Sequence, residues 1–193
     1  MNYSDLKSAL FILLLSSCAT TYYPDVDFNP EYNFSQLQTF VVFDSYPADQ
    51  SASKTLNRTI SDLDNERVIK AITSNLQQKG MTTAEVDNAD MQVRFQLVTK
   101  DRTRLTTYNS GYYQCWRCRG AYGMPAPITE VDIREYVEGT MIIDFVDPKL
   151  GKSVWRSVVT KALPSKVPVD EKQEKTQQLI NAMLASFKAP VTK

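Results

Sequence analysis

Alternation of apolar and polar residues marks three strands in the middle and later parts of the chain. Residues 91–97 alternate strictly, which is typical of a strand with one buried and one solvated face. Residues 137–146 and 154–163 show related patterns. Between these two lie residues 147–152, where a Pro and a Gly suit a tight turn, so the last two strands should form a hairpin.

A further strand and a first helix precede these three strands. Residues 39–44 form a short apolar, aromatic and β-branched run, which favours a strand. A helix should follow, capped by Asp62 or Asp64, running to about Lys79 and ending at Gly80. Its apolar residues share one helical face. They are Val68, Ile69, Ile72 and Leu76.

A second helix is predicted near the end of the chain. It should begin near Asp170, with Gln173 completing a capping box, and end before Pro190. Its first half is polar, whereas its second half carries an apolar face. That face consists of Leu179, Ile180, Met183, Leu184 and Phe187.

The order of elements is therefore strand, helix, strand, strand, strand, helix. Polar residues on alternate strand positions and a late hairpin favour a largely antiparallel sheet of about four strands. Two amphipathic helices would cover one face of this sheet. We expect a two-layer α+β fold.

The first residues have the pattern of an export signal. A positive start that includes Lys7 precedes an apolar run over residues 9–15, and small residues follow. This order is typical of a secretory signal peptide spanning residues 1–17. The run is shorter than the roughly 20 residues that span a bilayer.

The residues at the expected cleavage point resemble a bacterial lipobox. Leu15-Ser16-Ser17-Cys18 follows the apolar run directly, and in a lipobox the Cys is lipidated and becomes the first mature residue. Two or more acyl chains on Cys18 would anchor the chain stably to a membrane. In Gram-negative lipoproteins an Asp after the Cys favours the inner membrane, and Ala19 stands there instead. The resemblance implies an outer-membrane lipoprotein facing the periplasm; the alternative is an ordinary cleaved signal with a chance Cys.

Length and charge restrict the function classes. The chain has 193 residues, which suits one domain, and its 22 basic residues balance its 22 acidic residues. A neutral chain has no long-range field to gather nucleic acid, so no nucleic-acid partner is expected. No His is present, which removes the usual general base and the commonest metal ligand. Residues 18–36 should form the lipidated start and a tether, and residues 37–188 a single domain.

The hairpin region resembles a known bacterial family. Residues 136–147, followed by Val154-Trp155-Arg156, are similar to the periplasmic lipoproteins that contain domain of unknown function 4136. The resemblance extends over most of residues 20–188. It implies an α+β envelope lipoprotein without established catalytic residues. A Tyr- and Cys-rich stretch at about 105–127 departs from the compact family pattern and is interpreted as an insertion.

Two thiols lie within this insertion. Cys115 and Cys118 form a C-x-x-C pair, which can be a disulfide, a pair of reactive thiols or half a metal site. A zinc site needs about four Cys or His ligands, and the flanking Gly and Tyr residues suit a loop rather than a helix start. A disulfide that stiffens the loop is expected in an oxidising periplasm. No metal or cofactor is predicted.

The same loop is the candidate binding site, because aromatic and Arg side chains dominate binding hot spots. Arg102 and Arg104 lead into it. The alternative is that the rings pack on one another to hold a long connection. The candidate binding residues are Tyr108, Tyr112, Tyr113, Trp116, Arg117, Arg119 and Tyr122.

Acidic residues offer weaker hypotheses. Residues 25–29 imitate the start of a calcium loop, but Pro30 stands where Gly is needed, so that site is rejected. Four acids could include a carboxylate pair for glycan cleavage, or could be a solvated strand edge. They are Glu130, Asp132, Glu135 and Glu138.

We therefore expect a non-enzymatic envelope lipoprotein that binds an envelope protein or cell-wall glycan. The alternative is an envelope enzyme, either a glycan hydrolase or a thiol-disulfide protein that uses Cys115 and Cys118.

Overall fold

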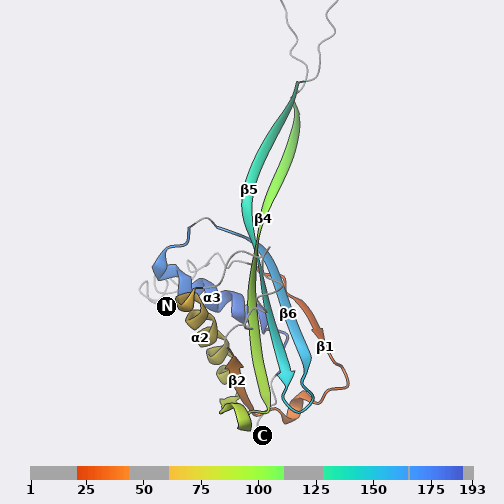
Figure 1. The fold of residues 1–193 in the computed structure, drawn as a ribbon, viewed down its shortest axis with the longest axis vertical. Helices are drawn as coiled ribbons and strands as arrows, with labels where there is room; N and C mark the ends of the chain where they lie inside the picture. The colour runs from red at the N-terminus through yellow and green to blue at the C-terminus, as the bar shows by residue number, and fades with distance from the viewer. Residues whose placement is uncertain (1–20, 44–60, 111–127, 165, 189–193) are drawn as a thin grey trace, which may run out of the picture.

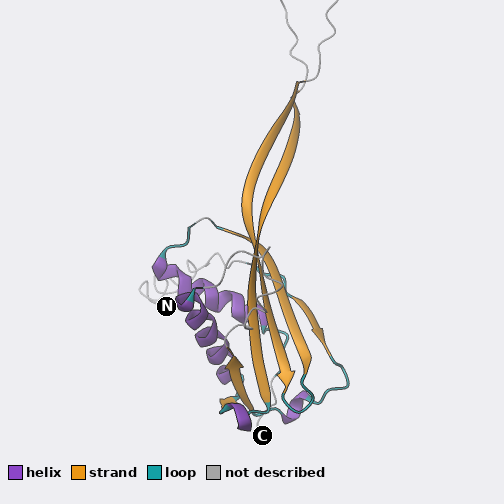
Figure 2. Cartoon of the chain, in the orientation of Figure 1, coloured by secondary structure: helices purple, strands orange, loops and turns teal. Residues whose placement is uncertain are grey.

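A computed structural model describes residues 21–43, 61–110, 128–164 and 166–188. They form an α+β fold in which two helices pack on one face of a twisted six-stranded sheet (Figures 1 and 2). The two-layer prediction with helices on one face is thus confirmed. The main elements in chain order are β1 (Asp25–Phe28), β2 (Thr39–Phe43), α2 (Asp62–Gln78), β3 (Thr82–Thr83), β4 (Met91–Ser110), β5 (Ile128–Asp147), β6 (Lys152–Leu163) and α3 (Val169–Met183).

The sheet is mixed, with the order β1-β6-β5-β4-β2-β3. β4, β5, β6 and β1 are antiparallel neighbours, whereas β2 runs parallel to both β4 and β3. The prediction of about four strands in a largely antiparallel sheet is therefore inexact. α2 carries the chain from β2 back to the same end of the sheet, and such a crossover makes the strands on either side of it parallel.

β1 and β3 are the two strands that the sequence pattern did not predict. β3 has two residues, and β1 has four residues that are mostly exposed. Neither is long enough or apolar enough to show an alternating pattern. β1 lies inside the segment predicted to be a tether and pairs with β6, with Asp25 opposite Val158 and Phe28 opposite Trp155.

α2 forms where predicted, with a different cap. The side chain of Ser61 accepts a hydrogen bond from the backbone N–H of Asp64 at 3.2 Å, so Ser61 caps the helix and not Asp62 or Asp64. Gly80 follows the helix with φ of 90°, the left-handed geometry that Gly adopts without steric cost. The apolar face is confirmed, since Val68, Ile72 and Leu76 are buried.

α3 also forms where predicted, but its capping box does not. Pro168 precedes the helix, and no side chain caps its first turn, so the role expected of Gln173 is wrong. A Pro at this point suits the extended residue before a helix, because its φ is fixed and it has no N–H. Ile180 and Met183 on the helix, and Leu184 and Phe187 in the segment after it, are buried as predicted.

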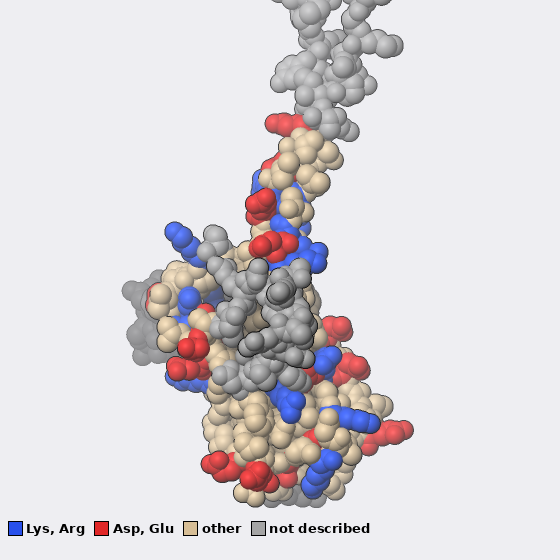
Figure 3. Space-filling model, in the orientation of Figure 1, with Lys and Arg blue, Asp and Glu red and all other residues tan. Residues whose placement is uncertain are grey.

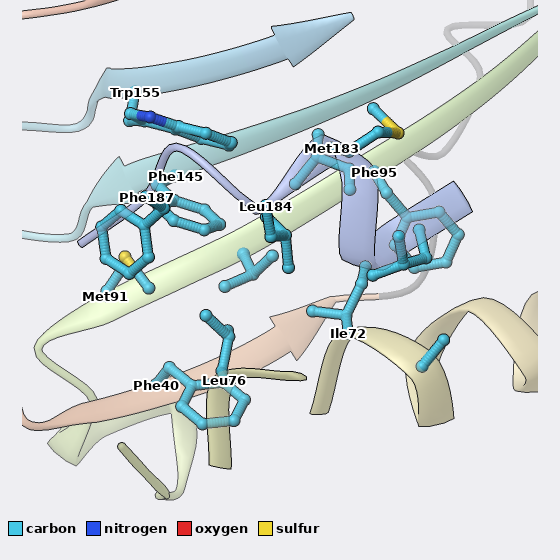
Figure 4. Packing of buried hydrophobic residues seen from close by; sticks show 14 of the residues in the cluster. Phe40, Ile72, Leu76, Met91, Phe95, Phe145, Trp155, Met183, Leu184 and Phe187 are labelled. Carbon is cyan, nitrogen blue, oxygen red and sulfur yellow. The ribbon is translucent and has the colours of Figure 1, made fainter. Parts of the chain in front are cut away.

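The core lies between the helices and the sheet. Phe145 of β5 stacks on Trp155 of β6 with ring centroids 4.5 Å apart, and Phe187 meets Phe145 edge-on at 4.7 Å (Figure 4). Aromatic rings that meet in these geometries contribute beyond their buried area. This cluster fixes the end of α3 against the middle of the sheet.

Candidate functional site

β4 and β5 continue far beyond the rest of the sheet. Each has 20 residues, and they pair from Gln92 opposite Val146 to Ser110 opposite Ile128. β6 follows β5 only as far as Val137, which pairs with Leu163. Residues 102–110 and 128–136 therefore form a two-stranded ribbon that projects from the body (Figures 1 and 2). We call this ribbon the arm; nine residues of strand extend about 30 Å.

One face of the arm is apolar and open to solvent. Leu105 and Ile133 lie directly opposite each other, and Val131 lies on the same face two residues toward the tip. Their exposed fractions are 67%, 62% and 51%, respectively. In the body, the same face of β4 and β5 carries the buried core residues, among them Phe95 and Ile143. The arm thus extends the apolar face of the sheet beyond the helices that cover it.

The other face of the arm carries charges of both signs (Figure 3). Arg102 donates to Glu138 at 2.8 Å, and Arg134 donates to Asp132 at 2.8 Å. Arg104 lies directly opposite Arg134, so two positive side chains are cross-strand neighbours. Like charges in such positions repel each other.

The predicted binding loop joins the two strands at the tip of the arm. Tyr108 lies on β4, opposite Glu130, with 53% of its surface exposed. The stretch interpreted as an insertion therefore begins as strand, because β4 continues to Ser110. The other predicted binding residues lie outside the described residues, as do both thiols of the loop and the predicted lipidation site. They are Tyr112, Tyr113, Trp116, Arg117, Arg119 and Tyr122, with Cys115, Cys118 and Cys18.

The four acidic residues of the glycan-cleavage hypothesis do not form one cluster. Three of them lie on the two faces of the arm, and Glu138 lies at its base. Glu130, Asp132 and Glu138 are on the charged face, and Glu135 is on the apolar face, because neighbouring residues of a strand point in opposite directions. Asp132 and Glu138 each form a salt bridge with an Arg side chain, Arg134 and Arg102, respectively. This arrangement matches a solvated strand edge.

The sequence pattern missed the arm strands on both sides of the loop. Val131 and Ile133 are apolar at alternate positions of β5, but Leu105 of β4 stands between Thr and Arg residues with no apolar residue two positions away. The alternation at residues 131 and 133, within a partly polar segment, is the signal that marks the β5 side of the arm. The missed residues are Leu105, Val131, Ile133 and Arg134, which define the two faces of the arm.

A hollow of about 410 Å³ lies where β1 pairs with β6. Phe28, Asn29, Ser153 and Arg156 are among the residues that line it. Two of these lining residues also bind the buried carboxylate of Asp144, which accepts hydrogen bonds from Arg156 Nε at 2.6 Å, Arg156 Nη2 at 3.0 Å and Ser153 Oγ at 2.9 Å. This bidentate pair between Asp144 and Arg156 ties β5 to β6.

Two carboxylates, those of Asp90 and Asp147, have pKa values below the usual value. Burial would raise the pKa of Asp90, but bonds from Gln38 N, Thr39 Oγ1 and Thr39 N hold it below its usual value. The pKa of Asp147 is lowered in the same way: bonds from Tyr32 and the backbone N–H groups of residues 149 and 150 outweigh burial. Both carboxylates join segments at the end of the sheet away from the arm.

Within the described ranges there is neither a group of three metal-ligating side chains nor a helix of sufficient length and apolar character to span a bilayer. Among the described residues, the arm is the most distinctive surface, because it combines an exposed apolar face with a charged one.

Two solved structures are similar to this chain at low sequence identity. A PDZ domain protein from Parabacteroides distasonis is similar in structure, with a TM-score of 0.50 and 13% identity over 100% of this chain. This chain covers 41% of that protein, so it spans about two fifths of its length. A PelC dodecamer from Paraburkholderia phytofirmans gives a TM-score of 0.46 and 13% identity, covering 88% of this chain and 99% of that one. No curated protein matches the sequence.

A family model matches residues 24–187, which is most of the chain. The match begins just before β1 and ends at Phe187, so it spans the whole described fold together with the arm and its loop. The chain belongs to the family described as domain of unknown function DUF4136.

Proposed function

We propose that this protein is a non-enzymatic lipoprotein, anchored through Cys18 in the outer membrane, that binds an envelope partner through the loop at the tip of the arm. The observation that carries the proposal is the length of the β4–β5 pair beyond the sheet, from Val137 and Asp101 to Ile128 and Ser110. A ribbon of this kind presents whatever loop it carries at a distance from the body.

The composition of the loop supports binding. Its 17 undescribed residues, 111–127, contain Tyr, Trp and Arg side chains, which dominate binding hot spots and also suit sugars or peptides. Loops carried on a rigid scaffold are common binding elements. A disulfide between Cys115 and Cys118 would stiffen the loop and reduce the entropy lost on binding.

The anchor is tested by two matched Cys variants in cells. Cys18→Ser should abolish palmitate labelling and release the protein from sedimented envelopes, because it removes the only thiol at the lipobox. Cys115→Ser serves as the control and should leave both unchanged. Retention of label or sedimentation by Cys18→Ser would refute the anchor.

The loop is tested by crosslinking in intact cells. A photo-crosslinking amino acid at Trp116 should capture a defined envelope protein or glycan strand, and adding Tyr113→Ala should reduce that capture strongly. The control position is Tyr23, an aromatic residue of the body that is 85% exposed. Equal capture from both positions, or no effect of Tyr113→Ala, would remove the loop as the binding site.

A further inference from the structure

We propose that two copies of this chain associate through the arm, by pairing β5 of one copy with β5 of the other in antiparallel orientation. This interface uses residues 130–136 and not the loop, so it does not depend on the function proposed above. Three features of the arm support this pairing: an open strand edge, the order of charges along that edge and an exposed apolar face that the partner would extend.

The edge of β5 is open along the arm. β6 covers this edge only up to Val137, and no other described strand pairs with residues 128–136 on that side. Alternate N–H and C=O groups of an open edge point outward and can accept another strand. The segment contains no Pro, which is one of the residues that commonly block such pairing.

Residues 130–136 are complementary to themselves. When two β5 edges pair about a two-fold axis at Ile133, Asp132 lies opposite the partner's Arg134, and Arg134 lies opposite the partner's Asp132. Glu130 then faces the partner's Tyr136. No two like charges are directly opposite in this arrangement.

Neighbouring registers lack this complementarity. A two-fold axis at Asp132 places that residue opposite the partner's Asp132, and an axis at Arg134 places two guanidinium groups opposite each other. Val137 is already paired with Leu163 of β6. Pairing between the two β5 strands must therefore end with Tyr136 opposite the partner's Glu130. The charges and the end of β6 therefore select one register.

The pairing would also join the apolar faces of the two arms. Leu105 and Ile133 are more than half exposed in one copy, and in this register Ile133 lies opposite the partner's Ile133, so that the two Ile133 side chains and the two Leu105 side chains form one row across four strands. On the same face, Val131 lies opposite the partner's Glu135. Within one arm, Arg134 lies opposite Arg104, and the partner's Asp132 would offset that repulsion. The same register therefore places apolar side chains together on one face of the arm and opposite charges together on the other.

Charge reversal tests the interface in the purified full-length chain, kept in mild detergent. The wild type should sediment as a dimer over a concentration series. Asp132→Arg and Arg134→Asp should each associate at least about tenfold more weakly, since each replaces two attractive pairs with two repulsive ones. Lys70→Asp on the exposed side of α2 is the matched control and should remain dimeric.

Mixing the two reversed variants gives the decisive result. In a mixed dimer every pair across the two-fold axis again joins opposite charges, so the mixture should recover the dimer that neither variant forms alone. A wild type that stays monomeric, or a mixture that does not recover association, would overturn the proposal. The open edge would then be available to a different protein or to a membrane surface.

A cysteine pair gives an independent test in cells. Residues directly opposite on antiparallel strands have Cα atoms about 4.5–5.5 Å apart, within the range for a disulfide. Ile133→Cys should therefore form a crosslinked dimer on mild oxidation. Leu105→Cys is equally exposed on the same face but one strand further from the axis, and it should not. Equal crosslinking of both, or of neither, would contradict the proposed register.

Discussion

The hydroxyl of Tyr32 donates a hydrogen bond to the carboxylate of Asp147 at 2.7 Å, across 115 residues of sequence. Asp147 also accepts bonds from the backbone N–H groups of Lys149 and Leu150, and so closes the β5–β6 turn. Tyr32 in turn packs edge-on against Phe34 at 4.9 Å. One carboxylate therefore ties the segment after β1 to the hairpin at the end of the sheet away from the arm.

Tyr32→Phe should reduce the free energy of unfolding by about 1–2 kcal/mol, because it removes a hydrogen bond to a charged group and keeps the ring. Urea denaturation at neutral pH measures the change. Tyr23→Phe is the control, since Tyr23 is 85% exposed and its hydroxyl should contribute nothing measurable. Equal stability of Tyr32→Phe and wild type would show that water replaces the bond without cost.

The lowered pKa of Asp90 predicts that the free energy of unfolding decreases in acid. Its pKa is lower in the folded chain than its usual value near 3.8, so its stabilising effect is complete above that value and declines as the pH falls through the lower, folded pKa. Asp90→Asn should therefore be less stable than wild type at pH 7, and the difference should shrink below about pH 4. Urea titrations at several pH values test this; a difference that does not change with pH would assign the effect to shape alone.

The buried position of Phe187 predicts a large decrease in the free energy of unfolding when its side chain is shortened. Its ring is 3% exposed and contacts both Phe145 and Trp155. Phe187→Ala should cost about 3–5 kcal/mol of unfolding free energy, because the well-packed surroundings cannot close the cavity. Val169→Ala, at a position that is 74% exposed at the start of α3, should change it by less than about 0.5 kcal/mol. Comparable costs for the two would mean that the end of α3 does not pack as described.

Much of this fold could be predicted from local pattern. The alternation in residues 91–97 and 137–146 identified the buried halves of β4 and β5, and the helical spacing of Val68, Ile72 and Leu76 identified the face of α2. These signals are strong because one face is buried and the other is wet. The pattern could not show that β2 runs parallel to β4, since strand direction depends on the path of the intervening helix.

The arm was missed for a different physical reason. A two-stranded ribbon without a layer behind it needs no continuous apolar face, so Thr and Arg separate Leu105 from other apolar residues and the usual strand signal is weak. The candidate loop was predicted from composition alone. Its place between two paired strand ends is topological information, which becomes visible only when residues 110 and 128 are seen to be partners.

Because β4 runs from the body into the arm, substitutions at two of its positions should change the free energy of unfolding by very different amounts. Phe95 and Leu105 lie on the same face of β4, but Phe95 is 1% exposed under the helices and Leu105 is 67% exposed on the arm. Phe95→Ala should cost about 3–5 kcal/mol, whereas Leu105→Ala should cost less than about 0.5 kcal/mol. Urea denaturation of dilute protein compares them. A cost above about 1.5 kcal/mol for Leu105→Ala would mean that the apolar face of the arm is covered within a single chain and does not stand free for a partner.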